Sequence, residues 1–397
     1  MTALSTEIRE NPQRADDASP FSVCIVGCGN IGSAVVAMMA RSQAVSTLIL
    51  IDPDAYEARN LSGQCILRTD VGRPKVRAMA ALAHRINPAL DVVPIAARVE
   101  DVPLGAVRGV TALLSCLDSR GPRLYLNRTC QRLGIPWIDA GVDPDLHLVR
   151  VNVYRQGPDE PCLECAMSPV DYAALSARHP CDRATPDAAP TNAPASLGAL
   201  AASLMVVEAD KVVRGDWDDA AARRQVTFCT RTHRHVVTAF DRREDCLSGH
   251  EHWDVLPLGG SARTTTLRQV LDAPNGTTVR IAGRAFTRAL VCADCGATRS
   301  VLRLESRLTA AQSRCRRCGQ PGMVPVASQQ LERLDAPSLS DRHLAWPLAR
   351  VGLRDGDIVS VAREGHPDAH LLIGPDCAGN ETSRNHSDPA PEEIPHA

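Results

Sequence analysis

The chain has 397 residues, a formal net charge of −2, 44% apolar residues and only 3% aromatic residues. This length and apolar fraction suffice for two or three domains with buried cores. The near-neutral charge and the scarcity of aromatic rings argue against nucleic-acid binding, and the absence of a long apolar run argues against a membrane segment, so we expect a soluble cytoplasmic enzyme.

Residues 22 to 52 have the pattern of a nucleotide-binding β-α-β unit. Ser22 to Val26 and Val45 to Ile51 are short apolar runs that predict buried strands, and Ser33 to Arg41 has the small residues of a packed helix. The turn Gly27-Cys28-Gly29-Asn30-Ile31-Gly32 joins the first strand to this helix. A glycine turn in this setting predicts nucleotide binding far better than the same motif alone.

Each glycine has a separate physical role in such a turn. Gly27 permits the tight turn, Gly29 lets phosphates approach the backbone, and Gly32 allows the helix to pack closely on the sheet. The helix start offers N–H groups to an anion, and Asp52, at the end of the second strand, can accept hydrogen bonds from ribose hydroxyls.

A series of short motifs follows Asp52 in the chain. They are Asp52-Pro53-Asp54, Asn60-Leu61-Ser62-Gly63-Gln64, Gly72-Arg73-Pro74-Lys75, Cys116-Leu117-Asp118-Ser119 with Arg123 and Asn127, and Gly134 to Gly141. In this order and spacing the series resembles the ThiF/MoeB/HesA superfamily, over about Phe21 to Cys246.

That resemblance implies an ATP-dependent adenylyltransferase related to ubiquitin-activating enzymes. In this superfamily a C-terminal glycine carboxylate attacks the α-phosphate of ATP, giving an acyl-adenylate and pyrophosphate. Both reactants are anions, so such a site must position them and neutralise their charge. The implied partner is a ubiquitin-like or sulfur-carrier protein ending in Gly-Gly, and the implied assembly is a homodimer.

The resemblance also implies roles for individual residues. Lys75 corresponds to the cation on the phosphates, and Asp118 to the carboxylate associated with Mg²⁺. The residues implied to line the ATP site are Gly27, Gly29, Asn30, Gly32, Asp52, Asp54, Asn60, Gln64, Lys75, Asp118 and Arg123.

One position departs from the family pattern. The usual stretch is Asn-Leu-x-Arg-Gln, in which the arginine reaches the phosphates, whereas this chain has Gly63 there. Arg59, Arg68 and Arg73 are nearby in sequence. A basic residue from the partner subunit's N-terminal segment, Arg9 or Arg14, is the other source that the resemblance suggests.

Two pairs of cysteines in the C-terminal part have the spacing of a zinc ribbon. Cys292 and Cys295 form one CxxC hook, and Cys315 and Cys318 form the second. In a cytosolic chain this arrangement favours tetrahedral Zn²⁺ over disulfides. We expect the metal to hold this small β module together.

A second zinc site is implied by the resemblance. Cys162 and Cys165 lie where the superfamily has the first half of its structural zinc site, and Cys246 begins the second half. The family's fourth cysteine is replaced by Gly249. His250 is the preferred fourth ligand, with His252 as the alternative, since imidazole is an ordinary zinc ligand.

Cys181 lies in a Pro/Ala-rich stretch that crosses over the active site in relatives. There a cysteine often takes the activated acyl group, so we expect Cys181 to form a thioester, with His179 or Arg183 favouring the thiolate. Six further cysteines are expected to be small buried apolar residues: Cys24, Cys28, Cys65, Cys116, Cys130 and Cys229.

The expected fold class is α/β: a Rossmann-like, mostly parallel sheet with helices on both faces, plus a C-terminal β-rich appendage that contains the zinc ribbon. A closing helix is expected over Leu197 to Val213, and a turn followed by a strand over Val351 to Val361. The expected parts are a mobile arm (1–20), an adenylation domain (21–250), the β-rich domain (251–375, with the ribbon at 292–318) and a disordered tail (376–397).

We therefore expect adenylation of a carrier protein's C-terminal glycine, followed by transfer to Cys181, with ATP, Mg²⁺ and Zn²⁺ as cofactors. A conjugating enzyme or a sulfurtransferase is the expected downstream partner. Three alternatives stay open at this point: carrier activation without an enzyme thioester, an NAD-dependent oxidoreductase, and a nucleotide-binding module without turnover.

Overall fold

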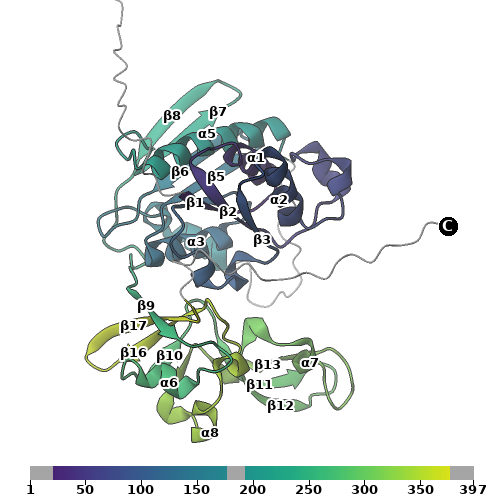
Figure 1. Cartoon of the computed structure of the whole chain (residues 1–397), viewed down its shortest axis with the longest axis vertical. Helices are drawn as coiled ribbons and strands as arrows, with labels where there is room; N and C mark the ends of the chain where they lie inside the picture. Colours follow the sequence, from purple (N-terminus) through teal and green to yellow (C-terminus); the bar gives the residue numbers. More distant parts are fainter. Residues whose placement is uncertain (1–20, 177–192, 376–397) are drawn as a thin grey trace, which may run out of the picture. The chain divides into compact units, whose positions relative to one another are not determined.

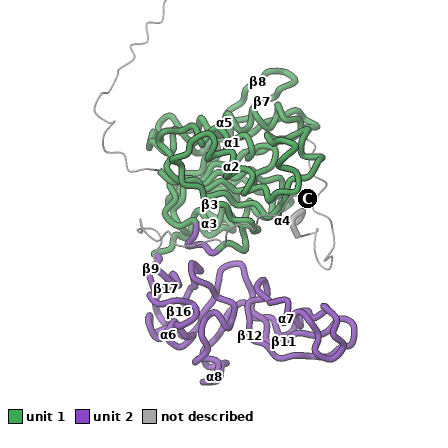
Figure 2. Tube along the Cα trace, turned by 45° about the vertical axis from the view of Figure 1, so that its right-hand side comes forward, with its two compact units in different colours: residues 1–102, 107–254 green, residues 103–106, 255–397 purple. Residues whose placement is uncertain are grey.

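The computed structural model describes residues 21–176 and 193–375. The predicted N-terminal arm, Cys181 and the predicted C-terminal tail lie outside these residues. The described residues form two compact units, one within residues 1–102 and 107–254 and the other within residues 103–106 and 255–397 (Figure 2). The sequence-based boundary, after residue 250, differs from the observed division, which follows Asp254.

Unit 1 is built on one sheet of eight strands in the order β3-β2-β1-β4-β5-β6-β7-β8 (Figure 1). The first five strands in this order are parallel, and the last three join by antiparallel pairing. The strands are β1 (Phe21–Val26), β2 (Val45–Ile51), β3 (Asp91–Ile95), β4 (Ala112–Ser115), β5 (Trp137–Asp143), β6 (Leu148–Tyr154), β7 (Arg224–Cys229) and β8 (Arg234–Ala239).

Helices cover both faces of this sheet (Figure 1). They are α1 (Asn30–Met39), α2 (Lys75–Ile86), α3 (Arg120–Leu133), α4 (Pro169–Ser176) and α5 (Ala195–Arg214). Helices α1, α2 and α5 contribute to one apolar core, whereas α3 contributes to the core on the opposite face. The mostly parallel α/β fold predicted from the sequence is thereby confirmed.

Strand β1 explains how the two cores are divided. Val23 and Ile25 belong to the core shared with α1 and α5, whereas Cys24 and Val26 belong to the core shared with α3. Successive side chains of a strand point to opposite faces, so a strand that is covered twice must be apolar throughout. This is why the sequence has a continuous apolar run here rather than an alternating one.

The sheet order places the carboxyl ends of β1 and β4 next to each other. After β1 the chain continues to β2 on one side, whereas after β4 it continues to β5 on the other side. Crevices at such a switch point are the usual ligand sites of open α/β sheets. The glycine turn follows β1 and Asp118 follows β4, so both lie at this edge.

Unit 2 contains two further sheets. A five-stranded sheet has the order β15-β10-β16-β17-β9, and a smaller sheet has β11 between β12 and β13, with β14 also pairing to β11. The elements are β9 (Val255–Gly259), α6 (Leu267–Asp272), β10 (Thr278–Arg280), β11 (Phe286–Cys292), β12 (Thr298–Leu304), α7 (Ala310–Ser313), β13 (Met323–Pro325), β14 (Gln330–Leu331), β15 (Arg333–Asp335), α8 (Asp341–Leu344), β16 (Ile358–Arg363) and β17 (His366–Ile373). The predicted β-rich appendage is confirmed.

Helix ends and cysteine burial show where the sequence was and was not sufficient. Helix α5 ends at Gly215, whose φ of +76° closes the helix in the left-handed conformation. Of the six cysteines expected to be buried, Cys65 is exposed and Cys116 and Cys229 are half-buried. The prediction was wrong for Cys65, because it lies in a loop after Gln64 rather than in a packed element.

None of the described helices combines the length and apolar character that crossing a bilayer would require.

Candidate nucleotide site and cysteine clusters

The glycine turn has the close backbone approaches that its sequence predicts. Gly27 has a φ of +91°, and a Cβ there would lie 2.6 Å from the Cys116 carbonyl oxygen. A Cβ at Gly32 would lie 1.8 Å from the Gly27 carbonyl oxygen. A Cβ at Gly29, by contrast, would have no other atom within 4 Å. Gly27 and Gly32 are therefore required by packing, whereas the open face at Gly29 leaves room for a ligand.

The start of α1 is suited to an anion. Gly29 is the N-cap residue, and no side chain caps the first turn. The unpaired N–H groups of a helix start, together with the helix dipole, attract phosphate groups.

A buried carboxylate braces this turn. Asp52 is 5% exposed; its Oδ2 accepts a hydrogen bond from the Cys28 N–H at 2.7 Å, and its Oδ1 accepts one from the Asp54 N–H at 2.9 Å. Burial raises the pKa of Asp52, despite the lowering effect of the nearby Lys75 cation. One Asp52 oxygen thus holds the glycine turn after β1, and the other holds the backbone just after β2.

Lys75, the first residue of α2, reaches back to the end of β2. Its Nζ lies 2.8 Å from Oδ2 of Asp54 and 3.9 Å from Oδ1 of Asp52. Burial alone would lower the pKa of Lys75, but Asp52 and Asp54 outweigh it and the pKa is raised. The ammonium group is therefore held charged beside the glycine turn, while Asp54 is 62% exposed.

Asn30 links two segments that are far apart in sequence. Its Nδ2 donates to the Gly63 carbonyl oxygen and, at 3.1 Å, to the Ala193 carbonyl oxygen. Its Oδ1 is buried and has no hydrogen-bond partner among the described residues. Gly198 permits this approach, because a Cβ there would lie 2.0 Å from Asn30 Oδ1. The position of the family arginine is thus filled by backbone that Asn30 holds.

Asn60 and Gln64, on either side of Gly63, have different surroundings. The Asn60 side chain caps its own turn by accepting from the Glu57 N–H at 2.8 Å. Gln64 has a buried Oε1 with no hydrogen-bond partner among the described residues. Of the nearby arginines, Arg59 pairs with Glu57 at 2.9 Å and Arg73 pairs with Asp70 at 3.1 Å.

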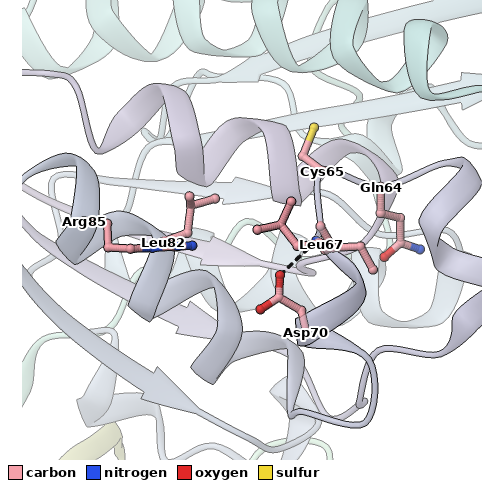
Figure 3. Close-up of a pocket in the computed structure, with 7 residues that line it drawn as sticks. Gln64, Cys65, Leu67, Asp70, Leu82 and Arg85 are labelled. Atoms are coloured by element: carbon pink, nitrogen blue, oxygen red, sulfur yellow. Dashed lines mark hydrogen bonds between the residues drawn. The ribbon is translucent and has the colours of Figure 1, made fainter.

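A cavity of about 430 Å³ lies beside Gln64 (Figure 3). Its lining includes Cys65, Leu67 and Asp70, together with Leu82 and Arg85 from α2. No residue of the glycine turn takes part, so this cavity is distinct from the expected phosphate position.

Asp118 is exposed at the end of the segment after β4. The side chain of Arg123, one turn into α3, donates from Nη2 to the Leu117 and Ala140 carbonyl oxygens and from Nε to Asp139 at 3.0 Å. We expected Arg123 in the ATP site; among the described residues its guanidinium donates to these three protein oxygens. It therefore holds the backbone that carries Asp118.

Asp139 is the centre of a buried network that the sequence reasoning missed. Its carboxylate is fully buried and pairs with Arg123 and, at 2.9 Å, with Arg150. It also accepts from Ser115 Oγ at 2.6 Å, and that oxygen accepts from Trp137 Nε1 at 2.9 Å. A signal was available, because Asp139 lies within the mostly apolar run from Ile135 to Ala140, and a carboxylate buried with such a run needs a buried cation.

The first cysteine cluster brings together Cys162, Cys165, Cys246 and His250, whose ligand atoms lie within 4.8 Å of one another. The Sγ atom of Cys162 lies 3.8 Å from that of Cys165 and 3.6 Å from that of Cys246. A tetrahedral zinc–thiolate site requires sulfur separations of about 3.8 Å. This donor set fits Zn²⁺.

His250 rather than His252 faces the three sulfur atoms. Its Nε2 lies 3.3 Å from Cys165 Sγ, and its Nδ1 lies 3.3 Å from the Gln131 amide. A metal-bound imidazole needs an acceptor for its other ring N–H, and the buried, otherwise unpaired Gln131 Oε1 provides one when the amide is turned over. The His252 ring packs instead against Gly134.

Glu164 lies between Cys162 and Cys165, in η5 (Leu163–Ala166), and ties this cluster to two helices. Its buried carboxylate accepts from both Nε and Nη2 of Arg128, from Asn127 Nδ2 at 3.1 Å, and from Tyr172 OH at 2.9 Å. Burial alone would raise the pKa of Glu164, but these donors outweigh it and the pKa is lowered. The network joins α3 and α4 to the cysteine loop.

The second cluster, in unit 2, consists of Cys292, Cys295, Cys315 and Cys318. Cys292 and Cys318 have their sulfur atoms 3.6 Å apart, and Cys295 and Cys315 have theirs 3.7 Å apart. Among the described residues, the apolar core around them adds only Leu290 and Met323 as buried members, with Ala297, Val301 and Leu308 partly buried. Four thiolates at these separations fit Zn²⁺.

The chain is similar in sequence to several curated proteins. The molybdopterin-synthase adenylyltransferase of Salmonella typhimurium is 33% identical over 146 residues, covering 36% of this chain and 57% of that protein. The SAMP-activating enzyme E1 of Haloferax volcanii is 30% identical, covering 36% and 52%. The ubiquitin-like modifier-activating enzyme 5 of Oryza sativa subsp. japonica is 28% identical, covering 40% of each. The chain spans about half the length of these curated relatives.

Among solved structures, Escherichia coli MccB with ATP matches 57% of this chain and 66% of that chain, at 22% identity and a TM-score of 0.47. PaaA matches 56% of this chain and 65% of that chain, at 20% identity and a TM-score of 0.44. The model of the ThiF family matches residues 6–248, which is more than half of the sequence. The chain belongs to the ThiF family.

Proposed function

We propose that this chain adenylates the C-terminal glycine carboxylate of a ubiquitin-like or sulfur-carrier protein at the expense of ATP. The observation that carries the proposal is the open helix start at Gly29 beside the buried Lys75 cation, at the switch point of a ThiF-family sheet. The named relatives, which are adenylyltransferases and activating enzymes of such carriers, support the same reaction class.

In the proposed reaction a carrier carboxylate oxygen attacks the α-phosphorus of ATP. The bond to the bridging oxygen breaks, pyrophosphate leaves, and the carrier becomes an acyl-adenylate. The start of α1 would receive the phosphates, and Lys75 would exchange its Asp54 partner for a phosphate oxygen. Mg²⁺, when bound, neutralises phosphate charge, and the exposed carboxylate of Asp118 is the residue that would hold it.

A second step is part of the same proposal: the Cys181 thiolate attacks the acyl carbon, and AMP leaves. This residue lies outside the described part of the chain, so the step rests on the family resemblance alone. Mass spectrometry of the enzyme with ATP and carrier tests it. An adduct on the wild type that is absent from Cys181→Ala is expected, and an adduct that persists in Cys181→Ala contradicts the step.

The proposed assembly is a cytoplasmic homodimer with Mg²⁺ at the ATP site and Zn²⁺ at both cysteine clusters. A conjugating enzyme or sulfurtransferase would receive the activated carrier. Sedimentation of the full chain tests the dimer, and a monomer at micromolar concentration contradicts it.

ATP–pyrophosphate exchange, measured with candidate carriers ending in Gly-Gly, tests adenylation. We expect carrier-dependent exchange in the wild type, its loss in Asp118→Asn, and its retention in Asp91→Asn, an exposed carboxylate at the amino end of β3, on the opposite edge of the sheet. ATP binding without exchange for every carrier would favour a module without turnover, to which the missing arginine at Gly63 points. Binding of NAD in place of ATP would reject the proposal.

A further inference from the structure

Unit 2 contains a cationic cavity that the proposed adenylation does not use. It has a volume of about 380 Å³, and its lining includes three arginines, Arg263, Arg303 and Arg354. Asp355 is the acidic residue among the described residues that line it. Part of its lining, Gly352 to Asp355, belongs to the turn before β16.

Arg303 is fixed in place from one side. Its Nε donates to the Arg307 carbonyl oxygen at 2.7 Å, and its Nη1 donates to the Arg350 carbonyl oxygen at 3.2 Å. Gly352, with a φ of +91°, makes room for it, because a Cβ there would lie 3.2 Å from Arg303 Cγ. No carboxylate among the described residues pairs with this guanidinium. It is therefore an oriented cation with unused donor capacity.

The two other arginines have no partner that would neutralise them. Among the described residues, the side chains of Arg263 and Arg354 form neither an ion pair nor a hydrogen bond. Both are exposed, so water screens their charges and the free-energy cost of placing them near Arg303 is small. Three arginines thus line one cavity.

The neighbouring carboxylates are already engaged. Asp357 is buried and pairs with both Nη atoms of Arg307, and it also accepts from the Arg354 N–H at 2.7 Å. Asp355 accepts from the Ala262 N–H at 2.6 Å. Burial, and then the cations of Arg354 and Arg307, lower the pKa of Arg303, as expected for like charges crowded together.

We propose that this cavity binds an oxyanion of the phosphate class. Guanidinium groups present paired N–H donors that match phosphate oxygens, and several of them together bind a doubly charged anion better than a single one does. The chemistry is shared by inorganic phosphate and by phosphate monoesters. The site stands whether or not the chain adenylates a carrier.

Calorimetric titration of the zinc-loaded full chain, in low salt and without phosphate buffer, tests the proposal. The probes are inorganic phosphate and O-phosphoserine, which distinguish free phosphate from a monoester. We expect binding of at least one probe, weakened about ten-fold or more by Arg354→Gln and by Arg263→Gln. Because neither side chain forms a hydrogen bond or an ion pair among the described residues, both variants should fold normally. Added NaCl should weaken binding.

Two control variants make the result specific. Arg268→Gln removes an exposed arginine of the same unit that already pairs with Asp341 at 2.7 Å, and it should bind as the wild type does. Lys75→Ala alters the nucleotide site of unit 1 and should also retain binding. Absence of binding for both probes at millimolar concentration overturns the proposal, as does equal binding by Arg354→Gln and Arg268→Gln. Loss of binding in Lys75→Ala alone would assign the anion to the nucleotide site instead.

Discussion

The Nζ atom of Lys75 lies 2.8 Å from Oδ2 of Asp54, across the end of the second parallel strand. This contact holds a largely buried cation beside the glycine turn, with its partner carboxylate open to solvent. In the proposed reaction, an incoming phosphate oxygen would replace Asp54 as the partner of the Lys75 ammonium group. Asp54 thus holds the Lys75 ammonium group near the position proposed for the reacting phosphates, where negative charge would develop during adenylation.

Lys75→Met should lower ATP–pyrophosphate exchange by about 10² or more, because a positioned cation on a reacting phosphate contributes on that scale. Arg77→Met, an exposed position on the same helix, is the matched control and should keep its exchange. Exchange measured at saturating ATP separates loss of chemistry from weaker binding. Full activity of Lys75→Met would remove this residue from the site.

Two glycines of one turn should respond differently to the same substitution. Gly32→Ala places a methyl group 1.8 Å from the Gly27 carbonyl oxygen, so it should destabilise unit 1 severely. The methyl group of Gly29→Ala meets open space, so the free energy of unfolding should stay within about 1 kcal/mol of the wild-type value. This variant should nevertheless lose ATP binding, since the added methyl group faces the expected phosphate. Urea unfolding and ATP titration of both variants measure this contrast. Normal ATP binding by Gly29→Ala would contradict the expected phosphate position.

Comparing the sequence-based expectations with the structure shows which features could be predicted from the sequence. The turn around Gly27, the strand Val45–Ile51 and the cysteine spacings are local patterns, and each has one dominant physical reason, so their prediction needed no knowledge of the fold. The pairing of Asp139 with Arg150 depends on the register between β5 and β6, in which Gly141 faces Arg150. The cavity between Arg263, Arg303 and Arg354 joins three separated segments. Such non-local contacts are set by tertiary packing and leave only a weak trace in the sequence.

Asp139→Asn should destabilise unit 1 by about 3 kcal/mol, because it leaves two arginines facing each other around a fully buried position. Exchange should fall as well, since Arg123 positions the backbone before Asp118. The double variant Asp139→Asn/Arg150→Gln removes the excess charge and should recover part of the stability. Asp91→Asn, on an exposed strand position, is the control. This account would be contradicted if the double variant lost more free energy of unfolding than the two single variants lose when their losses are added.

The full chain should carry two zinc ions, as measured by elemental analysis after dialysis. Cys246→Ser and Cys315→Ser should each lower the content to about one, because each removes one of four ligands from a different cluster. Cys229→Ser lies outside both clusters and should keep two. Chelation should expose the segment from β11 to β13 to protease, since its core is too small to persist without metal. A metal-free chain that resists protease there would contradict the assignment.

Glu305 should make the stability of unit 2 depend on pH. Its Oε1 is buried without a hydrogen-bond partner among the described residues, while Oε2 accepts from Gln330 at 3.1 Å. Burial raises the pKa of Glu305 above its ordinary value of 4.5, although the Gln330 bond lowers it in part. A raised carboxyl pKa means that the folded state binds the proton more tightly than the unfolded state, so its contribution is present in acid and is lost as pH rises through the folded-state pKa.

Glu305→Gln, which cannot ionise, should therefore gain stability relative to the wild type as the pH rises from about 4.5 to about 7.5. Urea unfolding of both proteins at the two pH values measures the change, and effects of acid on the metal sites cancel in the comparison. Glu364→Gln, an exposed position between β16 and β17, should show no such trend. A relative stability of Glu305→Gln that is constant or falls with pH would mean that ionised Glu305 is compensated within the fold.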